Sequence, residues 1–453
     1  MRHVLAALLL TAASLGCAHS GTMGTEASRD PLDRAESAKA TGKVDDAIAA
    51  CRQALAADPK RLDAWRLLVQ LHAESGKLTE VTAELKAKLA AAPNDDALHY
   101  ALGLAYFAQT GTAGDLALRE FEQAEKLQPS QAEYPFRLGV GYFELERYPE
   151  ALVPLKRAVA LAPGTAKYHV PLGLTLARLD RKKEALAEFR ALLGLKPSGK
   201  DVKLAQQALE RFEDPLRDIP HAESDNVKRG IDWLHQADQP QQAIATFQDV
   251  LDRFPDLAPV HTLLGLAYER LDQSGPAVEH LTRAIELRPD AALPYLYLGE
   301  LYYSKQKPER ADDYFHKAVE RNPLLDRAWG RLGDLAMQRG DGAAAITDLK
   351  NAVVLTPDDA DSHKALAQAF ELAGQYAQAE DCLRGLVDRA PKDLDARLRL
   401  GFLYAALFHK ATTTDERGRR SAQAQACFQK VLDQQPENVA ASRALQQLRQ
   451  AAE

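Results

Sequence analysis

The chain has 453 residues, of which 57 are basic and 64 are acidic, so its formal net charge is −7. This balance gives no support to a nucleic-acid-binding groove, which needs a positive surface. Beyond the N-terminal segment, no stretch is long and apolar enough to predict a transmembrane helix.

The N-terminal segment "MRHVLAALLLTAASLGCAHSG" has a cation at Arg2, an apolar run from Val4 to Leu10, and a cysteine at Cys17. The apolar run is too short to span a bilayer as a mature helix, and the whole pattern is typical of a secretory signal. Cleavage of an ordinary signal after Ala18 would give a soluble exported protein.

Cys17 directly follows Gly16, and in this respect the segment resembles the lipobox of bacterial lipoproteins. The resemblance implies that residues 1–17 hold the signal and that the cleaved protein begins at a lipidated Cys17. The match is incomplete, because Ser14 and Leu15 stand where that family prefers leucine and a small residue. The small polar residues 18–29 predict a flexible tether.

The rest of the chain is periodic. In the C-terminal half, Pro255, Pro289, Pro323, Pro357 and Pro391 are each 34 residues apart, and Pro436 follows. A fixed period of this length indicates a solenoid of stacked units. An earlier series with nearly the same spacing consists of Pro59, Pro93, Pro129, Pro163 and Pro197.

Each unit predicts two helices. Apolar residues fall at helical spacing from Leu263 to Leu271, a turn follows, and a second helical run from Ala277 to Leu287 stops before Pro289. Proline has no N–H and disfavours helix in the preceding residue, so it marks the end of a unit.

Residues at fixed positions in these units resemble the tetratricopeptide repeat, with its pattern W-x2-L-G-x2-Y, then A-x3-F, A and P. The resemblance implies an all-α fold, an α-solenoid of about eleven helix–turn–helix repeats between about Asp30 and Pro436. Ala35 and Val69 replace the glycine in the first two repeats. The glycine position holds Gly103, Gly139, Gly173, Gly265, Gly299, Gly333 and Gly401.

Glycine and alanine at these positions let two antiparallel helices approach closely, while aromatic residues and leucine fill the space beside them. A single hairpin cannot bury enough apolar surface to offset its conformational entropy, so repeats must stack and share faces.

The period is interrupted between the two proline series. Between Pro197 and Pro255 the chain has an extra helical pattern, from Asp201 to Asp214, which we expect to cover the end of the fifth repeat. A proline-containing joint follows. The predicted domains are a first repeat block at 30–213, a joint at 214–223, and a second block at 224–453 that ends in a polar capping helix.

The histidines and cysteines that could bind a metal or react occupy recurring positions in the repeats. His99, His169, His261 and His363 occupy the position that holds Trp65 and Trp329 in other repeats, which predicts packing residues rather than metal ligands. Cys51, Cys382 and Cys427 lie in second helices at spacings that suit neither zinc nor a redox pair. We therefore expect no catalytic residue, cofactor or metal.

In the tetratricopeptide family, four positions of each first helix face a concave groove. In repeats three to five these positions are apolar and predict a peptide-binding groove, unless the tether or tight packing covers it. The candidate groove residues are Tyr100, Leu104, Phe107, Phe136, Val140, Phe143, Val170 and Leu174. In repeats six to ten the positions are polar, with Lys228, Asp232, His235, Glu269, Glu300, Tyr303, Asp334, Lys364 and Gln368.

These features predict a non-enzymatic, exported scaffold that binds other proteins or peptides. We expect a lipid on Cys17 to hold it at the periplasmic side of the outer membrane. The alternatives are an accessory subunit of an envelope enzyme or of a secretion, polysaccharide or pilus machine, and a soluble periplasmic protein. Some family members hold a terminal carboxylate with a Lys and Asn pair, to which Arg66 with Gln70 is the nearest equivalent here.

Overall fold

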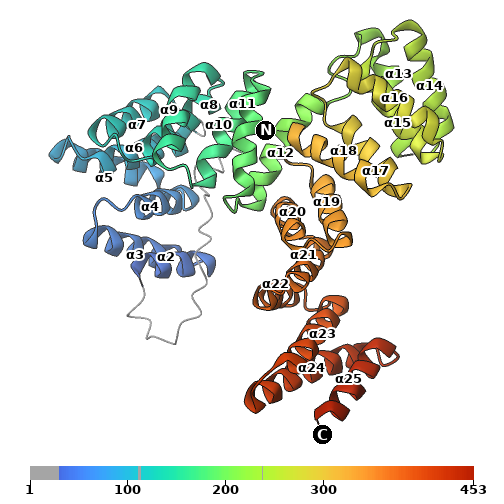
Figure 1. Cartoon of the computed structure of the whole chain (residues 1–453). Coiled ribbons are helices and arrows are strands. Elements are labelled where there is room, and N and C mark those ends of the chain that lie inside the picture. The colour runs from blue at the N-terminus through green and yellow to red at the C-terminus, as the bar shows by residue number, and fades with distance from the viewer. Residues whose placement is uncertain (1–29, 111–113, 237, 453) are drawn as a thin grey trace. The chain divides into compact units, whose positions relative to one another are not determined.

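The computed structural model describes residues 30–110, 114–236 and 238–452, so Cys17 and the predicted tether lie outside the described residues. The described residues form 24 α-helices and one short 3-10 helix, and they contain no strand. The predicted all-α solenoid is confirmed. Contacts divide the chain into two compact units, unit 1 ending at Pro197 and unit 2 beginning at Ser198 (Figure 1). Within these residues, no helix combines the length and apolarity needed to cross a membrane.

Unit 1 contains the first five repeats, each a hairpin of two helices. Their bounds are α2 (Pro31–Ala40) with α3 (Val44–Ala57), α4 (Leu62–Glu74) with α5 (Leu78–Ala91), α6 (Asp96–Thr110) with α7 (Asp115–Leu127), α8 (Glu133–Glu144) with α9 (Tyr148–Leu161), and α10 (Ala166–Arg178) with α11 (Lys182–Leu193).

Unit 2 begins with an unpaired helix, α12 (Gly199–Glu213), and a 3-10 turn, η2 (His221–Glu223). The remaining six repeats follow, and the last helix, α25 (Val439–Ala452), packs against α24 and α23. The hairpins are α13 (Ser224–His235) with α14 (Pro240–Arg253), α15 (Ala258–Arg270) with α16 (Ser274–Leu287), α17 (Leu293–Ser304) with α18 (Pro308–Arg321), α19 (Asp326–Gln338) with α20 (Gly342–Leu355), α21 (Ala360–Leu372) with α22 (Tyr376–Arg389), and α23 (Leu394–Lys410) with α24 (Thr414–Gln434).

The turn inside most hairpins has one recurring geometry. A residue just after the first helix takes a left-handed conformation, such as Gly340 at φ 76° or Gln306 at φ 55°. The next residue then donates its N–H back into the last turn of the first helix, as Lys307 does to the Tyr302 carbonyl at 2.9 Å. This arrangement ends the first helix and reverses the chain within a few residues.

In eight of the eleven hairpins, a side chain of the second helix lies directly on a glycine of the first. A Cβ built on Gly265 would stand 2.4 Å from Cγ of Leu281, and one built on Gly173 would stand 2.3 Å from Cε1 of Phe189. The glycine thus makes room for a large side chain, a more specific role than the close helix approach that we expected. Gly230 has the same role against Phe247, but its turn is one residue longer, so counting back from the prolines missed it.

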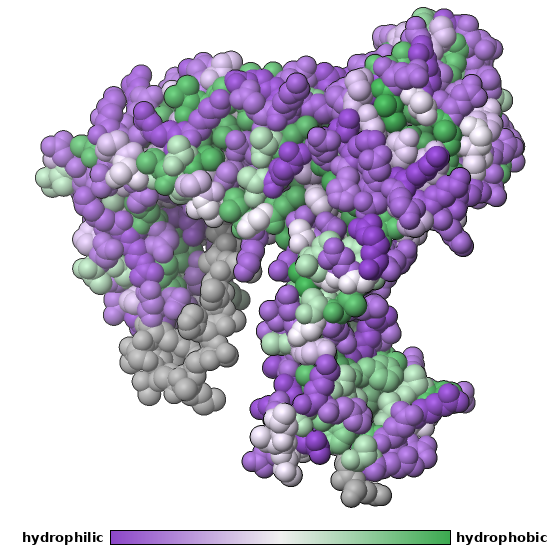
Figure 2. All heavy atoms as spheres, viewed as in Figure 1, coloured by the Kyte–Doolittle hydropathy of each residue, from purple (hydrophilic) through white to green (hydrophobic). Residues whose placement is uncertain are grey.

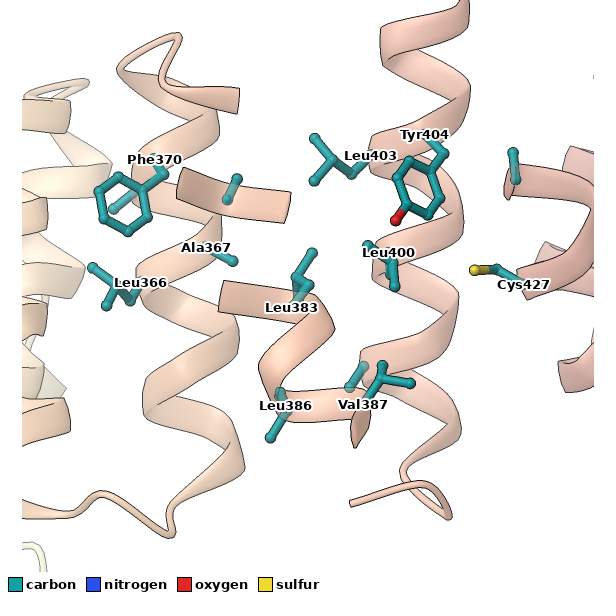
Figure 3. Close-up of a cluster of buried hydrophobic side chains, with 14 of the residues drawn as sticks. Leu366, Ala367, Phe370, Leu383, Leu386, Val387, Leu400, Leu403, Tyr404 and Cys427 are labelled. Atoms are coloured by element: carbon teal, nitrogen blue, oxygen red, sulfur yellow. The ribbon is translucent and has the colours of Figure 1, made fainter. Parts of the chain in front are cut away.

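The buried side chains form continuous layers between neighbouring hairpins. Figure 3 shows one such layer in repeats ten and eleven, with Leu383 of α22 and Leu400 of α23 between α21 and α24. Leu366 and Phe370 lie on the opposite side of α21. In repeat one, Ala35 and Cys51 occupy the two facing positions, and both are fully buried. Burial also raises the pKa of the Cys51 thiol to about 12, so this cysteine is a packing residue.

Gly265→Ala tests the contact with Leu281. Because the added methyl group would overlap Leu281, we expect a loss of about 1–3 kcal/mol in the free energy of unfolding, measured by chemical denaturation. Gly275→Ala is the matched control, since no heavy atom lies within 4 Å of a Cβ at that position of α16. The control should leave stability unchanged or raise it slightly. Equal losses in both variants would contradict the packing assignment.

The shared position of tryptophan and histidine has a hydrogen-bonding cause. Trp65 Nε1 donates to the Pro59 carbonyl at 2.8 Å, and His99 Nε2 contacts the Pro93 carbonyl at 3.0 Å. A carbonyl can only accept, so the histidine nitrogen carries the proton. The ring therefore ties each first helix to the proline that ends the preceding repeat. The same contact six residues back is made by His169, His261, Trp329 and His363.

The second nitrogen of these histidines meets a glutamate in some repeats and another kind of partner in others. His169 Nδ1 lies 2.8 Å from the Glu188 carboxylate, and this contact raises the pKa of His169. His261 Nδ1 instead lies 3.0 Å from His280 Nδ1, and burial lowers the pKa of both rings. Because His261 already donates from Nε2, His280 Nδ1 must donate to His261 Nδ1, so a further proton on His261 would break this contact.

His280→Glu should reverse the pH dependence of this pair. Since the folded pKa values of His261 and His280 are lowered, the pair loses stability as the pH falls below the unfolded pKa of about 6.5. A glutamate would recreate the His169 arrangement and raise the pKa of His261, which would add stability below that unfolded pKa.

We expect the melting temperature of His280→Glu to rise relative to His280→Asn as the pH is lowered from 7.5 to 5.5. Asp256, Glu279 and Arg283 also act on His261, and both variants retain them. A difference between the two variants that does not change with pH would show that the ring contact does not titrate as described.

Helix α12 belongs to unit 2, whereas we expected it to extend the first block. Ser198 and Asp201 form a capping box that starts it. A Cβ on Gly199 would stand 3.5 Å from the Pro357 ring, Gln206 donates to the Leu324 carbonyl at 3.4 Å, and the Ala292 N–H donates to Glu213 at 3.5 Å. These contacts fall seven residues apart on α12 and reach the turns between successive repeats, so α12 lies along one edge of repeats seven to ten and against α20 (Figure 1).

The joint after α12 is also fastened to unit 2. Arg288 donates to the Asp218 carboxylate at 2.6 Å and to the Phe212 carbonyl at 3.1 Å. Ile219 is buried in the core of repeats six and seven. The predicted joint is therefore part of the packed surface of unit 2.

Candidate functional site: the first-helix faces

In each unit, the first helices of neighbouring repeats contact one another, as α4 does with α6 and α15 does with α17. Together they form a surface that we call the first-helix face. The sequence placed all candidate binding residues on this face, so their exposure and partners decide what it can bind.

The candidate apolar groove in repeats three to five is buried. All eight of its residues, Tyr100, Leu104, Phe107, Phe136, Val140, Phe143, Val170 and Leu174, are at most 8% exposed. The Tyr100 ring lies 5.7 Å from that of Tyr134, and the Phe136 ring lies 5.0 Å from that of Tyr168. These rings join adjacent first helices, so they stabilise the stack and do not form the open groove that the sequence suggested.

The double variant Phe136→Ala with Phe143→Ala should therefore unfold more easily. Truncation of a buried phenylalanine typically costs about 3–5 kcal/mol, because it loses apolar burial and leaves a cavity. Val153→Ala on α9 is the control, since Val153 is 69% exposed. If thermal melting of the double variant matches that of the control, the two rings do not support the core.

On the first helices, large apolar side chains are exposed in repeats ten and eleven instead. Phe402 on α23 follows the glycine of its repeat and remains 44% exposed, while its ring edge contacts Phe428. Figure 2 shows apolar residues gathered over the C-terminal helices of unit 2. Phe402 follows Gly401 as Leu104 follows Gly103, so its repeat position could have identified this surface.

A polar pocket lies on the first-helix face of unit 1. Its volume is about 440 Å³, and helices α4, α6, α8 and α10 supply most of its lining. Glu133 is at its floor and is almost fully buried. The lining residues are Lys60, Leu62, Asp63, Arg66, Tyr100, Gln131, Glu133, Lys167 and Tyr168.

Buried Glu133 is held by cations and hydroxyls from three repeats. It accepts from Arg137 Nε at 2.8 Å and from Lys167 Nζ at 2.6 Å. The hydroxyls of Tyr168 and Tyr100 donate to it at 3.1 Å and 3.4 Å. Burial opposes its ionisation, but Arg137 and Lys167 outweigh burial and hold the pKa of Glu133 well below its usual range. The carboxylate is therefore charged at all ordinary pH values, and its contacts fix the floor of the pocket.

A second buried carboxylate, Asp96, is paired with Lys60 of the pocket lining. Asp96 accepts from Lys60 Nζ at 2.7 Å and from the Tyr134 hydroxyl at 2.7 Å. Burial opposes the ionisation of Asp96, yet the bonds from Lys60 and Tyr134 lower its pKa. This pocket was not predicted from the sequence, although Glu133 and Arg137 have the i, i+4 spacing of an ion pair on a helix.

The polar residues predicted to line a groove in unit 2 do not form one continuous site. Glu300, Tyr303 and Asp334 meet around Arg331, whose guanidinium lies 3.2 Å from Glu300, 3.6 Å from Asp334 and 4.7 Å from the centre of the Tyr303 ring. A cavity of about 160 Å³ adjoins this cluster. Burial is the main cause of a raised pKa at Asp334.

The other predicted polar residues do not join this cluster. His235 lines a different cavity of about 210 Å³, together with Ile231 and Tyr297. Lys228 and Asp232 form contacts within α13, with Asp225 and Gln236 respectively. Lys364 lies 2.7 Å from Asp361 and 3.1 Å from Asp395. Glu269 is near enough to Glu300 that this carboxylate adds to the effect of burial in raising its pKa.

The described ranges contain no group of three or more His, Cys, Asp or Glu side chains placed to hold a metal ion. Burial raises the pKa of the Cys382 and Cys427 thiols, which lowers their reactivity. These surfaces can therefore bind a ligand non-covalently through charged, polar and aromatic groups.

Comparison with known proteins agrees with this geometry. Profiles described as "Tetratricopeptide repeat" match residues 38–108, 100–166, 229–257, 262–324, 296–361 and 331–393, which together are more than half of the chain. The chain belongs to the tetratricopeptide repeat family. Proteins of this family are protein-interaction scaffolds, and a non-enzymatic binding role is consistent with the surfaces described above.

Individual tetratricopeptide proteins match only parts of the chain. The human mitochondrial import receptor subunit TOM70 is 28% identical over 183 residues, which cover 39% of this chain and 29% of TOM70. Human tetratricopeptide repeat protein 13 is 29% identical over 171 residues, which cover 37% of this chain and 20% of that protein. This chain thus spans less than a third of the length of these relatives.

Two solved structures are similar at low identity. YrrB, described as a tetratricopeptide protein with an unusual peptide-binding site, is 20% identical with a TM-score of 0.39, covering 44% of this chain and 96% of its own. The Cut9–Hcn1 complex of the APC/C is 15% identical with a TM-score of 0.37, covering 92% of this chain and 95% of its own.

Proposed function

We propose that this tetratricopeptide protein is an exported scaffold that binds peptide segments of other proteins and is held at an envelope membrane by a lipid on Cys17. The observation that carries the binding part is the pocket of about 440 Å³ on the first-helix face of unit 1, because its walls are fixed by buried ion pairs. A site with preformed walls loses less conformational entropy when a ligand binds.

The attachment part rests on the sequence. Cys17 follows a short apolar run and precedes a small polar segment, in the order found in lipoproteins. No membrane-spanning helix occurs among residues 30–110, 114–236 and 238–452, so the proposed attachment depends on Cys17. A single acyl chain binds membranes only weakly, so stable anchoring requires more than one chain on this cysteine.

Cys17→Ser should abolish lipidation and move the protein from the detergent phase to the aqueous phase in a phase-partition assay. Mass spectrometry of the N-terminal peptide should show the added lipid in the wild type alone. Cys51→Ser, in the repeats, is the matched control and should leave partitioning unchanged. Identical mass and partitioning of the wild type and Cys17→Ser would support soluble export instead.

The binding part is tested by capture from envelope extract, followed by competition with synthetic peptides from the captured protein. We expect one short peptide to displace the whole partner. If no peptide from the partner competes, the scaffold does not bind extended segments and this part of the proposal is wrong.

A further inference from the structure

The pocket on unit 1 has more positive than negative charge to offer a ligand, although the whole chain carries a net charge of −7. Its two acidic lining residues already have cationic partners. Glu133 is bound by Arg137 and Lys167, and Asp63 lies 3.1 Å from Arg61.

Arg66 differs from the other cations of the pocket. Lys60 is paired with Asp96 at 2.7 Å, and Lys167 is paired with Glu133 at 2.6 Å. In the part of the chain that the structure describes, Arg66 lies within ion-pair distance of no carboxylate, although its side chain is half-buried in the pocket wall. Gln70, one turn further along α4, already donates to Glu74 at 2.8 Å.

An unpaired guanidinium in a half-buried wall is a strong anion receptor. Its planar set of N–H donors fits a carboxylate in a bidentate manner, and partial burial weakens the screening by water. Lys60 also lines the pocket and has donors left after its bond to Asp96, since an ammonium group carries three. The fixed acids on the floor do not compete for Arg66, because their own contacts hold them in place.

We infer that this pocket binds an acidic segment of a partner protein, with Arg66 as the main contact for a glutamate or aspartate side chain. The inference rests on the proposed scaffold function and names the ligand chemistry of its unit 1 site. Lys60 and Arg66 come from repeat two and Lys167 from repeat five, so the positive charges lie on different sides of the opening. A segment with several acidic side chains can reach more than one of them, whereas a single terminal carboxylate reaches one.

The test measures binding of a fluorescently labelled peptide to the full chain by anisotropy at low, fixed ionic strength. The probe is a Gly/Ser peptide with two glutamate pairs, acetylated at its N-terminus and amidated at its C-terminus. Arg66→Gln should raise the Kd for this peptide at least about tenfold, because it removes the charge and the bidentate donors while keeping a similar side-chain length.

Arg52→Gln is the matched control. Arg52 is on α3, outside the pocket, and its exposed side chain is paired with Glu84 at 3.0 Å, so the same charge change there should leave the Kd within about twofold. Thermal melting of both variants should match the wild type, which separates loss of binding from loss of folding. A peptide with glutamine in place of glutamate should bind at least about tenfold more weakly to the wild type.

Several outcomes would overturn the inference. These are no measurable binding of the glutamate peptide, equal effects of Arg66→Gln and Arg52→Gln, and equal binding of the glutamine peptide. A glutamine peptide with a free C-terminus that binds through Arg66 as tightly as the glutamate probe would assign the site to a terminal carboxylate instead. If Arg66→Gln still captures the envelope partner normally, this assignment fails while the scaffold proposal stands. If the glutamate peptide binds through Arg66 but no partner is captured, the scaffold proposal fails while the assignment of Arg66 stands.

Discussion

The seating of one large side chain on one glycine determines most of what this structure can do. In hairpin after hairpin, a phenylalanine or leucine of the second helix fills the space that a Cβ would occupy on the first helix. This contact fixes the distance and rotation between the two helices, so each hairpin is almost a rigid unit. The face of the first helix that bears the glycine therefore packs against the second helix of the same hairpin. The other positions of the first helix contact the neighbouring repeat or a ligand.

For binding, this means that the side chains on the first-helix face can differ between repeats while the packing of the hairpins stays the same. Aromatic rings in repeats three to five join adjacent first helices, and the ion pairs of Glu133 and Asp96 lie beside them. Burying charged groups costs free energy, which close opposite charges offset only with good geometry. The four groups that surround Glu133 meet that condition, and they leave the floor of the pocket charged and stationary.

The local features of the fold could be predicted from the sequence. Glycine, alanine and proline act within a single hairpin, so their spacing is enough to locate eleven of them. Features that depend on contacts between repeats were harder to predict. Phe136 and Phe143 occupy positions that are open in many tetratricopeptide proteins, and only the ring of the next repeat shows that Phe136 is buried here.

The partners of α12 could not be predicted for the same reason. Its apolar spacing predicts a helix with one buried side, but the turns that it contacts lie more than seventy residues further along the chain. The pocket around Glu133 is an intermediate case. Its Arg137 partner has a recognisable spacing, whereas Lys167 comes from the following repeat.

The seven-residue register of α12 has a mechanical consequence for unit 2. Two helical turns advance about 10 Å, which is close to the distance between packed helices, so one rigid rod meets the turns of consecutive repeats at equal intervals. Stacks that are joined only through nearest neighbours respond to load like a spring, because each junction yields a little. Along repeats seven to ten, α12 connects the repeats in addition to their own junctions. Any extension of these repeats must therefore strain all three contacts of α12 at once. Repeat eleven has no described contact with α12, so the elastic compliance of this unit should be concentrated at its C-terminal end.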